Sequence, residues 1–206
     1  IPYEAFDGCT SLVSIGDLNN VESIANEAFS NCSALEHVDK LDKITSIGQN
    51  AFKGCTALKS IGSLHNLETI GQGAFSGCSA LEHVDDLYSL TRLEYDVFSH
   101  CVSLISVDCS DKLTAIGSSA FFGCKALVSI GDLSNVTSIE SSVFRGCIAL
   151  KSIGNMPKLE SIGMQCFMGC TALETVGDLS SLKEIPSETF DGCTSLVSIG
   201  DLSNVT

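Results

Sequence analysis

Cysteine is the residue with the most regular spacing in this sequence of 206 residues, because nine of its eleven cysteines recur at intervals of 23 residues. These nine are Cys9, Cys32, Cys55, Cys78, Cys101, Cys124, Cys147, Cys170 and Cys193. A thiol can act as a nucleophile, ligate a metal or form a disulfide bond. A catalytic nucleophile, however, is expected once, beside a base that activates it. Recurrence at a fixed interval instead favours a structural role in each unit of a repeat.

Disulfide bonds are the structural role that so many cysteines first suggest. Stacking in register makes the Cα–Cβ bonds of neighbouring units parallel. Their Cβ atoms would then lie near the strand spacing of ~4.8 Å rather than the ~3.8 Å that a disulfide prefers. The number of periodic cysteines is also odd. The spacing therefore predicts a row of buried, mostly free thiols that pack as small hydrophobic groups and donate weak hydrogen bonds to the turn backbone.

The two remaining cysteines, Cys109 and Cys166, are also predicted to lie in the core. Cys166 replaces an alanine in a column of small residues, Ala28, Ala51, Ala74 and Ala120. Of all the thiols, we expect Cys109 to react first in the folded protein.

The histidines do not indicate a metal site. His37 and His83 share one column but lie two repeats apart, or roughly 10 Å, whereas ligands lie near 2.1 Å from a zinc ion. Both are expected to be solvated residues on a strand face. The sequence has no nucleophile elbow, phosphate-binding loop or short-spaced zinc motif. We therefore predict no catalytic residue, no metal site and no cofactor, and we expect that the protein is not an enzyme.

Aspartate recurs in two adjacent columns. One contains Asp17, Asp86, Asp132, Asp178 and Asp201, and the other contains Asp39, Asp85 and Asp108. The first interpretation is that Asp suits the turn that ends a strand. The alternative is an anionic surface that meets a basic partner or weakly holds calcium, although the spacing shows no cage of six to eight oxygen ligands. The densest part of this surface, Asp85, Asp86, Asp108 and Asp132, is the candidate ligand-binding site and is called the acidic ridge below.

The composition limits the possible partners. A total of 11 Lys and Arg against 25 Asp and Glu gives a formal net charge of −14, which repels a phosphate backbone, so we expect no nucleic-acid partner. No run of 18 apolar residues and no signal-peptide pattern occurs, so we expect no membrane insertion of this segment.

Phenylalanine and leucine follow the cysteine period. A phenylalanine lies three residues before each periodic cysteine and a leucine three residues after it, as in Phe52, Cys55 and Leu58. A fixed period of 20 to 29 residues with regularly placed leucines is typical of a leucine-rich repeat solenoid, in which each coil buries its apolar face on its neighbours. The predicted fold class is a right-handed solenoid of the α/β type. It would be built mainly from short parallel strands with tight turns or 3-10 segments, and all nine periodic Cys and Phe residues would be buried.

Each coil should contain two extended segments and one tight turn. The first L-x-x-I segment predicts a short parallel strand, which should end at the Gly or Asp that follows, as at Gly62 or Asp85, in a left-handed turn. The second L-x-x-I segment, such as residues 67–70, predicts an extended segment on the opposite side. The A-F-x-G-C segment predicts a tight helical turn.

These columns resemble the BspA-like (Treponema-type) leucine-rich repeats, whose units have Cys, Leu, Ile, Ala and Phe at the same offsets. The resemblance extends over essentially the whole chain. The family usually has an aliphatic residue eight positions after Cys and proline at nine. Here position eight is mostly polar and position nine is mostly Leu. The fifth coil, which has Cys109 and Ser110 at these positions, looks like the usual version of the family. The resemblance implies a protein-binding scaffold, at the cell surface or secreted, that mediates adhesion to host or matrix proteins.

We expect residues 1–206 to form one array of about nine coils. Because both ends lie inside a coil, we expect an excerpt of a longer protein, and exposed terminal coils would allow end-to-end self-association. An alternative function is a spacer or intracellular scaffold that serves a functional domain outside this segment.

Overall fold

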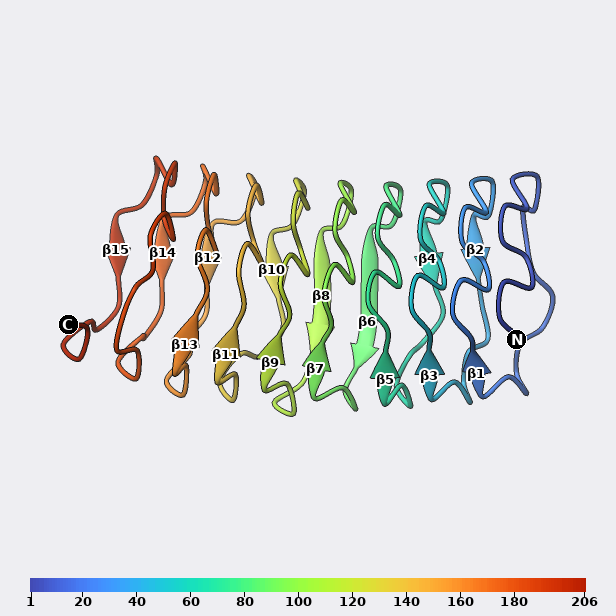
Figure 1. The fold of residues 1–206 in the computed structure, drawn as a ribbon, viewed down its shortest axis with the longest axis horizontal. Coiled ribbons are helices and arrows are strands. Elements are labelled where there is room, and N and C mark those ends of the chain that lie inside the picture. Colours follow the sequence, from blue (N-terminus) through green and yellow to red (C-terminus); the bar gives the residue numbers. More distant parts are fainter.

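Every 23 residues the chain completes one turn of a solenoid, and the turns stack side by side along the long axis (Figure 1). The computed structural model describes residues 1–206. Eight complete turns lie between Cys9 and Cys193. The predicted solenoid of short parallel strands with a 23-residue repeat is therefore confirmed.

Each turn contributes strands to two separate rows, as the two L-x-x-I segments predict. The first strand row contains β2 (His37–Val38), β4 (Ser60–Ile61), β6 (His83–Leu87), β8 (Ser106–Cys109), β10 (Ser129–Ile130), β12 (Ser152–Ile153), β14 (Thr175–Val176) and β15 (Ser198–Ile199). The second strand row contains β1 (Ser23–Ile24), β3 (Ser46–Ile47), β5 (Thr69–Ile70), β7 (Arg92–Leu93), β9 (Ala115–Ile116), β11 (Ser138–Ile139) and β13 (Ser161–Ile162). All strand pairs are parallel, with partners such as Ser23 and Ser46 one repeat apart.

The A-F-x-G-C segment forms a chain of tight turns, and the expectation of a helical turn there is wrong. Residues in left-handed conformation interrupt it, such as Glu27 (φ 57°) and Asn31 (φ 59°). Alternate amides then point in different directions. The N–H of Ala28 donates within the turn to Ala25 O at 3.3 Å, whereas the N–H of Phe29 donates to Ala51 O of the next coil at 2.8 Å. A helix would need every amide to bond within its own segment.

The glycine that follows the first strand has a different role from the one we expected. The φ angles of Gly62 and Gly131 are not left-handed. In two other coils a left-handed φ occurs one position later than this glycine column, at Lys40 and at Asp86. The reason for glycine is close packing, since a Cβ on Gly131 would lie 2.4 Å from the carbonyl oxygen of Cys109. The strand also does not end at Asp85 or Asp108, because β6 and β8 continue past them.

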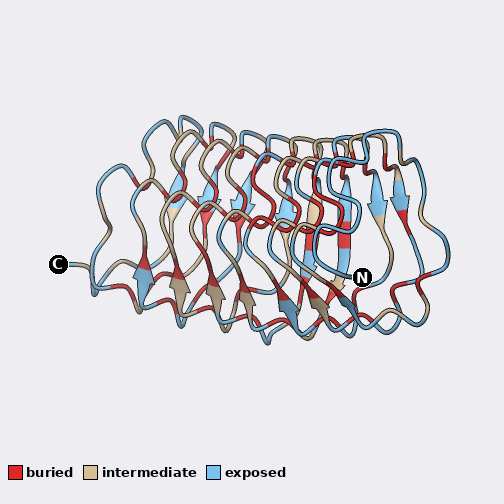
Figure 2. Cartoon of the chain, turned by 45° about the vertical axis from the view of Figure 1, so that its right-hand side comes forward, coloured by how far each residue is buried: buried red, intermediate tan, exposed pale blue.

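One hydrophobic core runs through the whole stack, and Figure 2 shows its buried segments inside the exposed outer loops. Phenylalanine rings of successive coils stack with centroids 5.1 to 5.6 Å apart, a common separation for aromatic pairs. Seven of the nine periodic phenylalanines and seven of the nine periodic cysteines are buried.

The expectation that all eighteen of these residues are buried is wrong at the two terminal coils. Phe6 is 37% exposed and Cys9 is exposed, while Phe190 and Cys193 are only partly buried. The physical reason is that each of these coils packs against a neighbour on one side only. No helix in the chain is long and apolar enough to cross a bilayer.

Candidate functional site

The acidic ridge lies along the outer side of the first strand row. Asp85 and Asp86 belong to β6, and Asp108 belongs to β8, the neighbouring strand. Asp132 follows β10, one coil further on. The side chains of Asp85, Asp108 and Asp132 are exposed, and Asp86 is partly buried. The stacking thus places all four carboxylates on three successive coils, in the order that the repeat period predicts.

Three of these carboxylates influence the phenol of Tyr88, which directly follows β6. The negative charges of Asp86, then Asp108 and Asp85, raise the pKa of Tyr88 above its ordinary value. The side chain of Tyr88 is 45% exposed. Sequence reasoning missed Tyr88, although a tyrosine in a mainly polar column was a signal that could have identified it.

Turn chemistry explains part of the ridge. The carboxylate of Asp132 accepts a hydrogen bond from the backbone N–H of Ser134 at 2.8 Å, which lowers the pKa of that carboxyl. Equivalent bonds occur at Asp17, Asp178 and Asp201. Asp86 instead has φ 66° and accepts a hydrogen bond from the Ser63 hydroxyl at 2.6 Å.

Neither turn hydrogen bonds nor ion pairs account for the other two ridge residues. The side chains of Asp85 and Asp108 accept no hydrogen bond, and no ion pair includes any residue of the acidic ridge. By contrast, Asp17, which lies in the column of Asp86 and Asp132, is paired with Lys40 at 3.1 Å. The acidic ridge therefore presents uncompensated negative charge beside an exposed aromatic ring.

Apolar side chains adjoin the ridge on the same face. Ile105, which directly precedes β8, is 38% exposed, and Val128, one coil further on, is 47% exposed. Ile105 and Val128 lie in one column of the repeat, which in other coils contains the charged residues Glu36, Lys59 and Glu82. The first strand row thus combines carboxylates, a tyrosine and two aliphatic side chains on one surface.

The thiols are packed away from solvent, with one clear exception. Burial raises the pKa of Cys55 and of Cys124 to about 12 from an ordinary value of 9.0. Cys166 is fully buried, as predicted, and Cys109 is only 6% exposed. The expectation that Cys109 would be the most reactive thiol is therefore wrong, because its side chain points into the core at the end of β8, whereas Cys9 is exposed.

His37 and His83 are exposed and lie on the first strand row, as predicted. Each shares a hydrogen bond with a serine of the next coil. The Nδ1 atom of His37 lies 2.8 Å from the hydroxyl of Ser60, and that of His83 lies 2.8 Å from the hydroxyl of Ser106. No three His, Cys, Asp or Glu side chains gather into a group that could hold a metal ion.

Comparison with known proteins agrees with this architecture. A family model described as "BspA type Leucine rich repeat region (6 copies)" matches residues 1–105 and residues 91–206. The crystal structure of a leucine-rich repeat protein from Treponema pallidum is similar, with 34% identity over 78% of this chain and 77% of that chain and a TM-score of 0.72. No curated protein sequence matches the chain.

A second solved structure extends the similarity to nearly the full length of the chain. It is a leucine-rich cell surface protein from Faecalibacterium prausnitzii A2-165, with 27% identity over 98% of this chain and 68% of that chain and a TM-score of 0.57. The family model, the cysteine and phenylalanine columns and the parallel strand rows all agree. This chain belongs to the BspA-type leucine-rich repeat family.

Proposed function

We propose that this chain is a non-enzymatic protein-binding scaffold, on the cell surface or secreted, that takes part in adhesion or host interaction. The observation that most supports the proposal is that Asp85, Asp86 and Asp108 lie on the neighbouring strands β6 and β8, next to the exposed Tyr88, with no basic residue paired to them. A stack of coils with a continuous core holds these side chains at fixed spacing.

The partner best suited to this surface is a basic protein, such as a host or matrix protein with an exposed cluster of Lys or Arg. Uncompensated carboxylates attract such a partner over distance and mainly increase the association rate. Tyrosine is enriched among the residues that dominate binding energy at protein interfaces, and Tyr88 would serve as the central anchor. Ile105 and Val128 would add apolar contact area beside it.

Support for the location comes from the similar structure from Faecalibacterium prausnitzii, which is described as a cell surface protein. Antibody labelling of intact cells against permeabilised cells tests this part of the proposal. Labelling of intact cells is expected. Labelling only after permeabilisation would favour an intracellular scaffold or spacer instead.

Binding is tested by immobilising the purified chain and passing serum and extracellular-matrix extracts over it. Captured proteins are identified by mass spectrometry, purified and measured singly for their association rate at increasing salt. The expected ligand is basic and associates more slowly as salt rises, because the Debye length falls. A ligand whose association is independent of salt would contradict a role for the ridge.

A further inference from the structure

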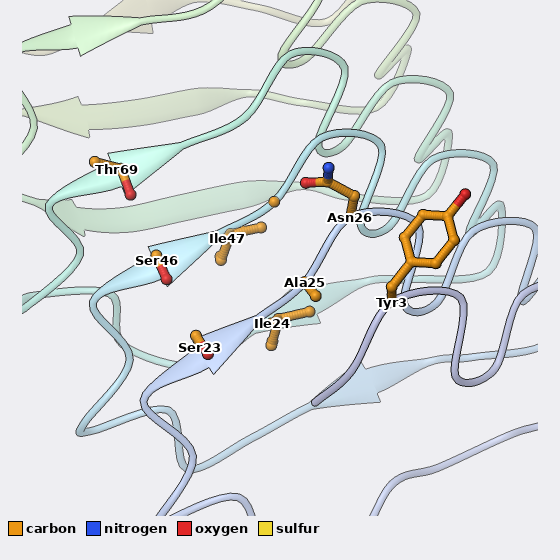
Figure 3. A pocket seen from close by; sticks show the side chains of 9 residues that line it. Tyr3, Ser23, Ile24, Ala25, Asn26, Ser46, Ile47 and Thr69 are labelled. Atoms are coloured by element: carbon orange, nitrogen blue, oxygen red, sulfur yellow. The ribbon is translucent and has the colours of Figure 1, made fainter.

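The second strand row has a groove of its own, and its lining is mainly uncharged, unlike the acidic ridge. Two open hollows of about 400 and 370 Å³ lie over β1, β3 and β5. They share Asn26, Ile47, Gly48 and Thr69 and so form one continuous groove. Its lining begins at Tyr3 and reaches Glu94, and Figure 3 shows the part from Tyr3 to Thr69.

Close approach of successive coils explains why this surface is hollow. A Cβ on Gly48 would lie 2.4 Å from the backbone N of Asn26, and a Cβ on Gly71 would lie 2.3 Å from the backbone N of Gln49. No side chain fits at these positions, so the floor of the groove is backbone. In the next coil the equivalent position is Glu94, which is paired with Arg92 at 3.3 Å and is the last residue along the chain that lines the groove.

Uncharged hydrogen-bonding groups border the groove in two rows. Figure 3 shows the hydroxyl-bearing residues Ser23, Ser46 and Thr69 at successive positions on β1, β3 and β5. The second row contains the exposed amides of Asn26, Gln49 and Gln72. The side chains of Gln49 and Gln72 form no hydrogen bond within the protein, so both their donor and acceptor atoms face solvent. Successive members of each row are one coil, or ~4.8 Å, apart.

An exposed tyrosine stands at each end of the amide row. Tyr3 and Tyr95 occupy the same column as the three amides, and their side chains are 60% and 48% exposed. They are four coils apart, which corresponds to ~19 Å at the strand spacing. Figure 3 shows Tyr3 standing beside Asn26 at the end of the strands. The ring of Tyr3 has no packing partner among the aromatic pairs of the core.

These groups match the chemistry of a sugar chain. A pyranose ring has an apolar C–H face that packs on an aromatic ring, and hydroxyl groups around its rim that bond to amides and hydroxyls. The chain has a net charge of −14, yet no charged residue lines the groove between Tyr3 and Gln72. Gln49 and Gln72 also line an adjoining hollow of about 130 Å³ that contains Tyr95, together with the oppositely charged Lys53 and Asp96. We propose that the groove and this adjoining hollow bind a neutral, linear oligosaccharide, with Tyr3 and Tyr95 as stacking platforms and Gln49 and Gln72 as hydrogen-bonding residues.

The test uses three neutral probes, which are cellohexaose, maltohexaose and N-acetylchitohexaose, titrated into the purified chain. Calorimetry measures affinity. Tyrosine fluorescence gives a second signal, because the chain has three tyrosines and no tryptophan. At least one probe is expected to bind with a Kd on the order of 1 mM or lower. Failure of all three probes to bind overturns the proposal.

Variants locate the site. Tyr3→Ala and Tyr95→Ala are each expected to weaken binding by about tenfold, and Gln49→Ala should also weaken it. The matched control is Met164→Ala, which removes an exposed side chain, 55% accessible, from the same column outside the groove and should leave sugar binding unchanged.

Circular dichroism confirms that each variant is folded, which is expected because these side chains are exposed. Unchanged affinity in the Tyr3→Ala, Tyr95→Ala double variant would overturn the proposal. The proposal would also fail if these variants lost capture of a basic protein ligand and no sugar bound, because the groove would then belong to a protein interface.

Discussion

The thiol of Cys55 lies 3.1 Å from the carbonyl oxygen of Phe29 in the preceding coil. The same oxygen accepts the backbone N–H of Cys32 at 3.2 Å. Cys32 to Cys193 all repeat this contact, with Sγ to oxygen distances of 3.0 to 3.2 Å. Each thiol is therefore both a small apolar filler and a second donor to the carbonyl that closes the neighbouring turn.

Replacing this thiol should measurably destabilise the stack. Cys55→Ala removes a buried sulfur and leaves the Phe29 oxygen with one donor fewer, so we expect the free energy of unfolding to fall by about 1–2 kcal/mol. Urea denaturation followed by circular dichroism measures the change. Cys9→Ala is the control from the same column, and since Cys9 is exposed its effect should be within about 0.5 kcal/mol. Equal losses in both variants would refute this role of the thiol.

Alkylation should distinguish exposed from buried thiols. In the native protein at neutral pH we expect one rapid adduct, at Cys9, and a slower one at the partly buried Cys193. In denaturant without reductant, all eleven cysteines should react, because all are free. Intact mass and peptide mapping give the count and the positions. Modification of Cys109 before Cys9, or a denatured count of three or fewer adducts, would contradict the row of buried free thiols.

Stability should fall at alkaline pH because the thiols are buried. Desolvation raises the pKa of Cys55 and Cys124 in the folded protein to about 12, above the ordinary value of 9.0 in the unfolded chain. The unfolded state therefore loses these protons first, so stability is full below pH 9 and decreases as pH rises toward 12. Thermal unfolding across this range measures the slope. The Cys55→Ala, Cys124→Ala double variant should lose stability less steeply, and an unchanged slope would exclude the thiols as its cause.

Two glycines that each directly follow the isoleucine at the end of a strand, Gly71 after β5 and Gly154 after β12, should differ in their tolerance of a side chain. Gly71→Ala places a methyl group 2.3 Å from the backbone N of Gln49 and should cost about 1–3 kcal/mol of stability. Gly154→Ala meets no heavy atom within 4 Å and should be neutral or stabilise by about 0.4–1 kcal/mol, since alanine restricts the unfolded chain. Denaturant midpoints of the two variants provide the comparison. A similar cost at both positions would show that coil contact is not what requires glycine at position 71.

The acidic ridge should contribute to recognition through its charge. Changing Asp85, Asp86, Asp108 and Asp132 together to Asn keeps the turn preference and removes four negative charges. The association rate with a basic ligand should fall by about tenfold or more, and its salt dependence should weaken. Surface plasmon resonance at several salt concentrations measures both quantities.

A control with the same charge change tests whether position matters. Changing the exposed Glu22, Glu68 and Glu160, which directly precede β1, β5 and β13, and the exposed Glu184 to Gln removes four charges away from the ridge. This variant should retain most of the association rate. If the ridge variant binds with unchanged rate and salt dependence, the aspartates serve turn geometry alone, and recognition must lie in the column of Val13, Glu36, Lys59, Glu82 and Ile105.

The sequence by itself determined the repeat, the two extended segments per coil and the identity of the core columns. An unbroken interval from Cys9 to Cys193 requires that equivalent residues stack, and apolar columns such as those of Phe52 and Cys55 must then face inward. These conclusions need only periodicity and the cost of exposing apolar surface. The burial of Cys166 among alanines followed from the same reasoning.

Only the tertiary structure decided the backbone conformation of the turns and the contacts between neighbouring coils. Left-handed φ angles at Glu27 and Asn31 direct alternate backbone amides to carbonyl groups of the next coil. Helix propensity depends only on residues close in the sequence, so it could not predict these hydrogen bonds between coils. The clash that excludes a Cβ at Gly71 is likewise a contact between coils.

Only the tertiary structure shows which exposed columns lie next to one another on the surface. Tyr88 lies near Asp86 and Asp108 because the coils close and stack at one particular spacing. For the same reason Tyr3 lines the groove over β1, β3 and β5, and Tyr95 lines an adjoining hollow that shares Gln49 and Gln72 with it. Exposed columns are not constrained by burial, so periodicity shows which residues share a column but not which columns meet. The candidate sites therefore depend on coil geometry, whereas the fold depends on the repeat.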